Sequence, residues 1–108
     1  MSIPVYSTVF IALQGLLGNF DYTVPNGYVA VLRDVDIYAS NLGPLNTVVR
    51  IIDPNTGGTV WFHDYGATSS GWAQWSGRQV FPEGEVIRAH VDNDPADVRA
   101  CGYLLTRV

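Results

Sequence analysis

The two histidines of the chain, His63 and His90, are its most versatile side chains for chemistry. A neutral imidazole is a common zinc ligand, and an imidazole beside a carboxylate can act as a general base in hydrolysis. His63 and Asp64 are neighbours in an expected strand, so their side chains point to opposite faces. We therefore expect no metal site. Zinc held by both histidines and one carboxylate remains an alternative, and a small hydrolase built on either histidine is the weakest functional hypothesis.

The segment from Asp92 to Asp97 resembles a calcium loop in its first three positions. An EF-hand needs glycine where Asp97 stands and glutamate where Tyr103 stands, so that motif fails. A looser calcium site using Asp92, Asp94 and Asp97 is an alternative to an ordinary acidic turn.

The remaining reactive side chains do not form a catalytic set. Glu83 and Glu85 are spaced like a glycosidase pair, but both belong to a turn in which carboxylates are simply solvated. The segment 68–71, Thr-Ser-Ser-Gly, lacks the Gly-x-Ser-x-Gly frame of a nucleophile elbow. The single cysteine, Cys101, excludes an intrachain disulfide and is expected to be a small buried hydrophobe. We expect no enzymatic activity and no cofactor.

Aromatic residues give a stronger functional signal. They crowd the middle third of the chain, and a domain of this size cannot bury all of them in one core. Because alternate strand residues face opposite ways, one member of each of the pairs Trp61/Phe62 and Trp72/Trp75 should face outward. Exposed aromatics near arginine are typical of protein interfaces, and aromatic platforms also hold sugar rings. The residues predicted to contact a partner are Tyr65, Trp72, Trp75 and Arg78.

The elements that position these residues are expected to be strands. Pro-x-Gly turns occur twice, in Val24–Val29 and Phe81–Val86, and each leads into a β-rich run. The expected strands are Tyr6–Leu13, Phe20–Val24, Tyr28–Ala39, Val48–Asp53, Thr59–Asp64, Trp72–Val80, Glu85–Asp92 and Val98–Thr106. About eight strands predict an all-β fold with one compact, jelly-roll-like β-sandwich domain over residues 1–108.

Three local features refine this arrangement. Glycines 15 and 18 predict a turn after the first strand, with a short helix over Phe10–Leu17 as the weaker alternative. The segment from Asp53 to Gly58 predicts a hairpin turn. In the long strand 28–39, alternation places Val29, Val31, Val35 and Ile37 on one face and Tyr28, Asp34, Asp36 and Tyr38 on the other. Arg33 interrupts the apolar face, and a bulge that turns it outward is favoured over an inward arginine paired with a carboxylate.

Composition narrows the range of partners. The 108 residues are 47% hydrophobic, enough for one core without disulfides. All six basic residues are arginines, which suits contacts with protein, and the net charge of −4 leaves no basic stripe for nucleic acid or for an anionic membrane. The first residues lack the features of a signal peptide, and no apolar run is long enough to span a membrane.

Five segments together resemble small virion structural proteins of tailed bacteriophages: 24–28, 31–36, 71–75, 78–84 and 97–106. The likeness covers most of the chain and consists of turn-and-strand patterns without a catalytic signature. It implies a compact β-sandwich that attaches to other virion proteins, as a capsid decoration or minor tail protein, often as a homo-oligomer. It also implies location in a virion assembled in the bacterial cytoplasm. The alternative hypothesis is a carbohydrate-binding module whose exposed aromatics bind a host-surface glycan.

Overall fold

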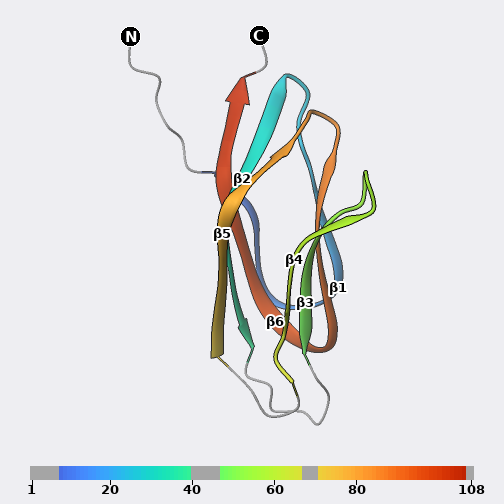
Figure 1. Ribbon diagram of the computed structural model, residues 1–108, viewed down its shortest axis with the longest axis vertical. Coiled ribbons are helices and arrows are strands. Elements are labelled where there is room, and N and C mark those ends of the chain that lie inside the picture. The colour runs from blue at the N-terminus through green and yellow to red at the C-terminus, as the bar shows by residue number, and fades with distance from the viewer. Residues whose placement is uncertain (1–7, 40–46, 67–70, 107–108) are drawn as a thin grey trace.

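The computed structural model describes residues 8–39, 47–66 and 71–106, and within these ranges the chain is all-β (Figure 1). The all-β prediction is therefore confirmed, and the described residues form six strands in place of the eight expected for the chain. The strands are β1 (Thr8–Thr23), β2 (Tyr28–Ala39), β3 (Val48–Asp53), β4 (Gly58–Asp64), β5 (Gly71–Phe81) and β6 (Val86–Thr106).

The difference in strand number comes from two long strands that continue where turns were predicted. In β1, Gly15 and Gly18 have φ of 66° and 93°, and the pairing with β6 shifts register on both sides of Leu16. The glycines therefore bend the strand and do not end it, and the alternative helix over Phe10–Leu17 was wrong. In β6, Asn93 has a φ of 76°, and the expected acidic turn from Asp92 to Asp97 is a bend within one strand.

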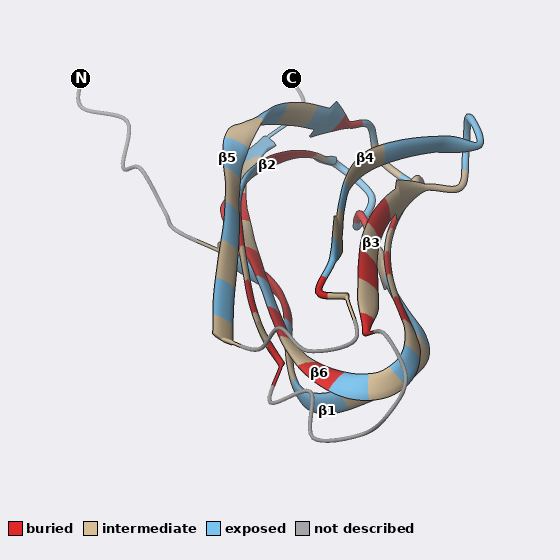
Figure 2. Cartoon of the chain, turned by 60° about the horizontal axis from the view of Figure 1, so that its bottom comes forward, coloured by how far each residue is buried: buried red, intermediate tan, exposed pale blue. Residues whose placement is uncertain are grey.

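The two halves of each long strand belong to different layers. Residues 96–106 of β6 pair with β2 and with residues 8–16 of β1, and β5 pairs with the far edge of β2. We call this four-stranded group layer A. Residues 86–92 of β6 pair with β3 and with residues 18–23 of β1, and β4 pairs with β3, which makes layer B. All pairings are antiparallel, and β1 and β6 pass from one layer into the other (Figure 2).

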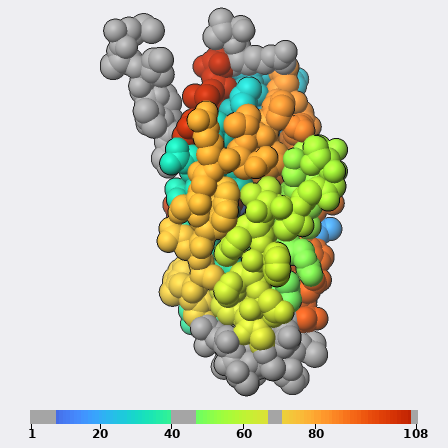
Figure 3. All heavy atoms as spheres, in the orientation of Figure 1, coloured from blue at the N-terminus to red at the C-terminus, as the bar shows by residue number. Residues whose placement is uncertain are grey.

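The hydrophobic core lies between the two layers (Figure 2). Layer A contributes Leu32, Val35 and Ile37, all fully buried, and layer B contributes Val49 and Ile51. On the open side, the edge strands β4 and β5 lie next to each other, and their atoms cover this face in the space-filling view (Figure 3). The sheet is thus nearly closed, with β4 and β5 as facing edges.

The bulge predicted at Arg33 is present and changes the two faces of β2. Register shifts between Leu32 and Asp34 occur against both neighbouring strands, and Arg33 is exposed. Because the bulge adds one residue, the inward side chains are Ala30 and Leu32 before it and Val35 and Ile37 after it. Placing Val29 and Val31 on the core face was therefore wrong. Asp34, Asp36 and Tyr38 face outward, as predicted.

Both Pro-x-Gly segments form turns, and the two turns bind each other. Tyr28 donates its backbone N–H to the Pro25 carbonyl, and Glu85 donates to the Pro82 carbonyl. Between the turns, Val24 and Glu85 form one backbone hydrogen bond of 2.9 Å, and the Glu83 carboxylate accepts the Gly27 N–H at 2.8 Å. The hairpin predicted between Asp53 and Gly58 joins β3 to β4. Thr68 to Ser70, expected to be a loop, lie outside the described residues.

Candidate functional site

The outer face of layer A carries the most distinctive combination of side chains. The strand register brings residues distant in the sequence into shared rows across β5, β2 and β6. One row contains Trp72, Tyr38 and Asp97, and the next contains Gln74, Asp36 and Arg99. The second row extends to Ala12 on β1, which pairs with Arg99. Aromatic, acidic and basic groups thus gather at one end of this face.

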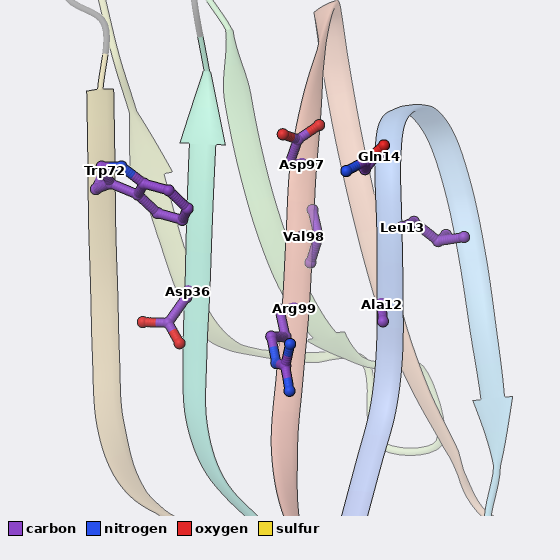
Figure 4. A pocket seen from close by; sticks show the side chains of 8 residues that line it. All are labelled: Ala12, Leu13, Gln14, Asp36, Trp72, Asp97, Val98 and Arg99. Carbon is purple, nitrogen blue, oxygen red and sulfur yellow. The ribbon is translucent and has the colours of Figure 1, made fainter.

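This end of the face is hollowed into an open pocket of about 750 Å³ (Figure 4). Its lining comes from all four strands of layer A and includes the aromatic Trp72 from β5 and four polar side chains: Asp36 from β2, Asp97 and Arg99 from β6, and Gln14 from β1. A pocket of this volume is in the range of small-molecule sites.

Trp72 is the most exposed large hydrophobic side chain of the described residues, with 76% of its surface accessible. The Tyr38 ring packs against it, with centroids 5.1 Å apart and an interplanar angle of 49°. The indole is therefore supported from one side and open on another.

The opposite end of the same face is apolar. Val80, Val31 and Tyr103 form one row across β5, β2 and β6, and Val29 pairs with Leu105 in the next. Val31 is buried although it lies outside the core cluster, while Val80 and Leu105 are 45% and 44% exposed. We call this surface the apolar patch. It consists of Val9, Val29, Val31, Val80, Tyr103 and Leu105.

The two histidines lie on opposite faces of layer B. His63 faces inward on β4, where its ring stacks on Trp61 and meets the edge of Tyr65 at 4.6 Å between centroids. His90 faces outward on β6, where Nε2 lies 2.7 Å from a carboxylate oxygen of Asp92. Nδ1 of His90 forms a short contact with Asn19. The structure therefore does not bring the two imidazoles together.

The outer face of layer B is a network of paired charges. Asp92 accepts from both Arg50 and His90, and Asp21 accepts two hydrogen bonds from Arg88, at 2.7 and 2.9 Å. Partial burial raises the pKa of Asp92, but the hydrogen bonds from Arg50 and His90 and the charge interactions with the same two side chains together outweigh it and hold the pKa below 3.8. The hydrogen bonds from Arg88 lower the pKa of Asp21 in the same way. These carboxylates are ionised at neutral pH and already have partners.

The four predicted contact residues divide between surface and interior. Trp72 and Arg78 face outward on β5, as alternation requires. Trp75 packs against the core, so Trp72 and Trp75 do face opposite ways, and Phe62 is 61% exposed while Trp61 packs inward. Tyr65 is only 4% exposed and donates its hydroxyl to the Gly71 carbonyl at 2.9 Å. Burial raises the pKa of Tyr65 to about 12, with a smaller contribution from Tyr38.

The other sequence candidates lie apart. Among residues 8–39, 47–66 and 71–106, no three His, Cys, Asp or Glu side chains are close enough to hold a metal ion. Asp92 is paired with Arg50 and His90, whereas Asp97 accepts the Gly15 N–H at 2.9 Å, so the two carboxylates have separate roles. Cys101 faces outward on layer A and is half-buried, not in the core as expected. The same part of the chain contains no helix with the length and hydropathy needed to cross a membrane.

Sequence reasoning did not identify Gln14, Asp36, Asp97 and Arg99 as a group. Alternation did place Asp36 and Tyr38 on one outward face, and it also implied that Arg99 and Asp97 share a face of their strand. What was missing is the strand order, because only the pairing of β2 with both β5 and β6 brings these residues beside Trp72.

Comparison with known proteins yields a likeness of fold. No protein-family model matches the sequence, and no curated protein does. Among solved structures, the core of Drosophila NLP, described for pentamer formation and histone binding, is similar with a TM-score of 0.55 and 12% identity. The match covers 94% of this chain and 97% of that one. A virus-like particle protein of the extra small virus of the giant freshwater prawn Macrobrachium rosenbergii matches with a TM-score of 0.42 and 14% identity, covering 100% and 84%. The chain therefore shares the general fold of the Drosophila NLP core.

Proposed function

We propose that this chain is a non-enzymatic structural protein that binds copies of itself and other subunits of a virus particle. In this proposal it is a capsid decoration or minor tail protein of a tailed-phage virion, assembled in the bacterial cytoplasm. The observation that supports it most is the apolar patch, whose members Val9, Val80 and Leu105 are each more than 40% exposed on one sheet face. Apolar surface of this kind, flanked by polar residues, is typical of a subunit contact.

Three further observations support assembly. Arg78 lies beside Val80 on the outer face of β5 and has no ion-pair partner among the described residues, so it is available to a neighbouring subunit. The facing edges of β4 and β5 would also be protected in a closed oligomer. The Drosophila NLP core, which has the same general fold, is described as forming a pentamer.

The proposal includes jelly-roll connectivity. Counting each half of β1 and β6 separately, layers A and B hold four strand segments each. Every connection between successive segments, including the bends within β1 and β6, passes from one layer to the other except the β3–β4 hairpin. Two four-stranded antiparallel layers of this kind recur in capsid and lectin domains.

The test is the solution mass of the purified chain, measured by light scattering across a range of concentrations. We expect a discrete oligomer for the wild type and a monomer for Val80→Glu or Leu105→Glu, because a charge in a closed apolar contact is costly. Phe62→Glu is the matched control, since Phe62 is exposed on the outer face of layer B. Circular dichroism would show that all three variants are folded.

Two outcomes would contradict the assembly part of the proposal. A wild-type monomer at every concentration excludes self-association, and equal dissociation by Phe62→Glu removes the apolar patch as the contact. The virion location has its own test, which is detection of the chain by mass spectrometry in gradient-purified particles of the virus that encodes it. Its absence from those particles would contradict that part of the proposal.

A further inference from the structure

The pocket at the Trp72 end of layer A has a chemistry that the apolar patch does not share. Its open surface is the Trp72 indole, 76% exposed and supported by Tyr38. A flat ring that packs against a second aromatic on one side offers an apolar platform on which a ligand can stack.

Unused hydrogen-bonding groups surround this platform. Asp36 and Arg99 are neighbours across β2 and β6, yet within the described residues neither forms a hydrogen bond or an ion pair. Gln14, on β1, also has a free amide there, and Asp97 uses one carboxylate oxygen for the Gly15 N–H and leaves the other free. Figure 4 shows these side chains along the strands on either side of the pocket.

The mixture of donors and acceptors restricts the ligand. Arg99 only donates, ionised Asp36 and Asp97 only accept, and the Gln14 amide does both. A ligand cation would satisfy the carboxylates but would be repelled by Arg99, and a ligand anion would be repelled by two carboxylates. Hydroxyl groups donate and accept, so a neutral polyhydroxylated ligand can use every group.

We propose that this pocket is a saccharide-binding site, in which a neutral pyranose ring stacks its C–H face on Trp72 and directs hydroxyls to Asp36, Asp97, Arg99 and Gln14. Because the pocket is open to solvent, it can hold one sugar unit of a glycan chain that continues out of the pocket. A small free metabolite would be better held by an enclosed cavity. This inference goes beyond the assembly proposal and depends on different residues at the other end of the face. In a symmetric assembly, repeated copies of such a site would bind a glycan surface with avidity.

The test has two steps, both with the intact chain. An array of immobilised neutral oligosaccharides, built from glucose, galactose, mannose and their N-acetyl derivatives, is first probed with the wild type. A soluble oligosaccharide retained on the array is then titrated into labelled protein while the three tryptophan indole N–H signals are followed by NMR. The Trp72 signal is identified by its loss in Trp72→Ala. We expect that signal to shift most, because Trp61 and Trp75 pack inward.

Variants separate the pocket from the rest of the surface. We expect at least tenfold weaker binding for Trp72→Ala and a clear loss for Asp36→Asn and Arg99→Gln, with the fold unchanged by circular dichroism. Phe62→Ala, which removes an exposed aromatic of layer B, should bind as the wild type does. Val80→Glu should still bind the oligosaccharide, though as a monomer and with less avidity. Loss of assembly and loss of the saccharide site can therefore be told apart.

Several results would overturn the inference. They are the absence of any neutral glycan retained by the wild type, undiminished binding by Trp72→Ala, and retention of acidic glycans only. Preferential binding of an arginine-rich peptide would show a cation site. Dissociation of the oligomer by Trp72→Ala would place this residue in a subunit contact, as the sequence alone suggested.

Discussion

Gly102 occupies the position in layer A that tolerates a side chain least. It lies buried on β6 opposite Leu32, next to the bulge at Arg33. A Cβ atom added there would lie 1.8 Å from the backbone oxygen of Val31 and 3.0 Å from the Phe10 ring. The bulge therefore requires glycine on the partner strand, since a backbone atom cannot move aside as a flexible side chain can.

We predict that Gly102→Ala destabilises the chain by about 3 kcal/mol, at the upper end of the usual cost of overpacking. The measurement is the urea midpoint of unfolding, followed by circular dichroism. Cys101→Ala is the control, because Cys101 precedes Gly102 but faces outward and is half-buried. If Gly102→Ala had the same urea midpoint as the wild type, β2 and β6 would have to be free to move apart at the bulge.

The pairs Trp61/Phe62 and Trp72/Trp75 show how well the sequence pattern alone separates exposed from inward-facing aromatics. The alternation of strand side chains correctly divided Trp72 from Trp75 and Trp61 from Phe62. Tyr65 was a different case, because it follows the end of β4 and turns into the core, where its hydroxyl has a backbone partner. Alternation does put Tyr65 on the same side as Trp61 and His63, but it could not tell which side of β4 faces the core, since a tyrosine with a satisfied hydroxyl packs as well inside as at an interface.

At the scale of elements, one side chain ties the turn of the β3–β4 hairpin to β6, beyond the end of the β3–β6 pairing. The Asn55 amide donates to the Val86 carbonyl and accepts from the Val86 N–H, both at 3.1 Å. The side chain thus continues the strand pairing of β6 beyond the last residues of β3. Asp53 orders the turn by accepting from the backbone N–H and the side chain of Asn55.

We predict that Asn55→Ala lowers the free energy of unfolding by about 1–3 kcal/mol, since the two hydrogen bonds to Val86 are lost at roughly 0.5–1.5 kcal/mol each. The exposed side-chain hydrogen bond to Asp53 is lost with them. Hydrogen exchange at the Val86 amide should accelerate more than exchange in the centre of β6. Thr59→Ala is the control on the same hairpin, because Thr59 is exposed and forms no side-chain hydrogen bond within the described residues. Unchanged exchange at Val86 would contradict the bridging role.

The sequence predicted where short strands begin and end better than it predicted which strands continue through a bend. Strands β2 and β3 begin and end where expected, because turn residues bound them on both sides. The pattern could not distinguish a bend from a turn at Gly15–Gly18 or at Asn93, since residues that tolerate positive φ serve both. For the candidate pocket the missing information was strand order, which alone places Gln14, Asp36, Trp72 and Arg99 together.

At the scale of the molecule, charge is distributed unequally between the two outer faces. On layer B, Arg88 is bonded to Asp21, and Arg50 shares Asp92 with His90, so the described charges there are largely paired. On layer A, Asp36, Arg78 and Arg99 have no such partners within the described residues. Layer B therefore stabilises the fold electrostatically, while layer A retains the charges that are free to bind a partner.

This division predicts how stability depends on pH. Hydrogen bonds from Arg88 lower the pKa of Asp21 below 3.8, and for Asp92 those from Arg50 and His90 do the same against the opposing effect of burial. Below the unfolded pKa the unfolded chain binds more protons at these sites. Their stabilisation is therefore complete above about pH 5 and is lost as pH falls through 3.8 towards the lower folded values. Both side chains are 39% exposed, so each contributes only about 0.2–1 kcal/mol at neutral pH.

The variant Asp21→Asn isolates one of these contributions. It should be less stable than the wild type at pH 7 by the amount of that ion pair, and the difference should shrink as pH falls through the acid range. Urea unfolding at a series of pH values, with circular dichroism as the signal, measures both curves. High salt should reduce the difference at pH 7, because partly exposed ion pairs are screened. If the difference in the free energy of unfolding between the wild type and Asp21→Asn stayed constant with pH and salt, Asp21 would stabilise the junction of β1 and β6 by packing. The ion pair with Arg88 would then not contribute to the stability of layer B.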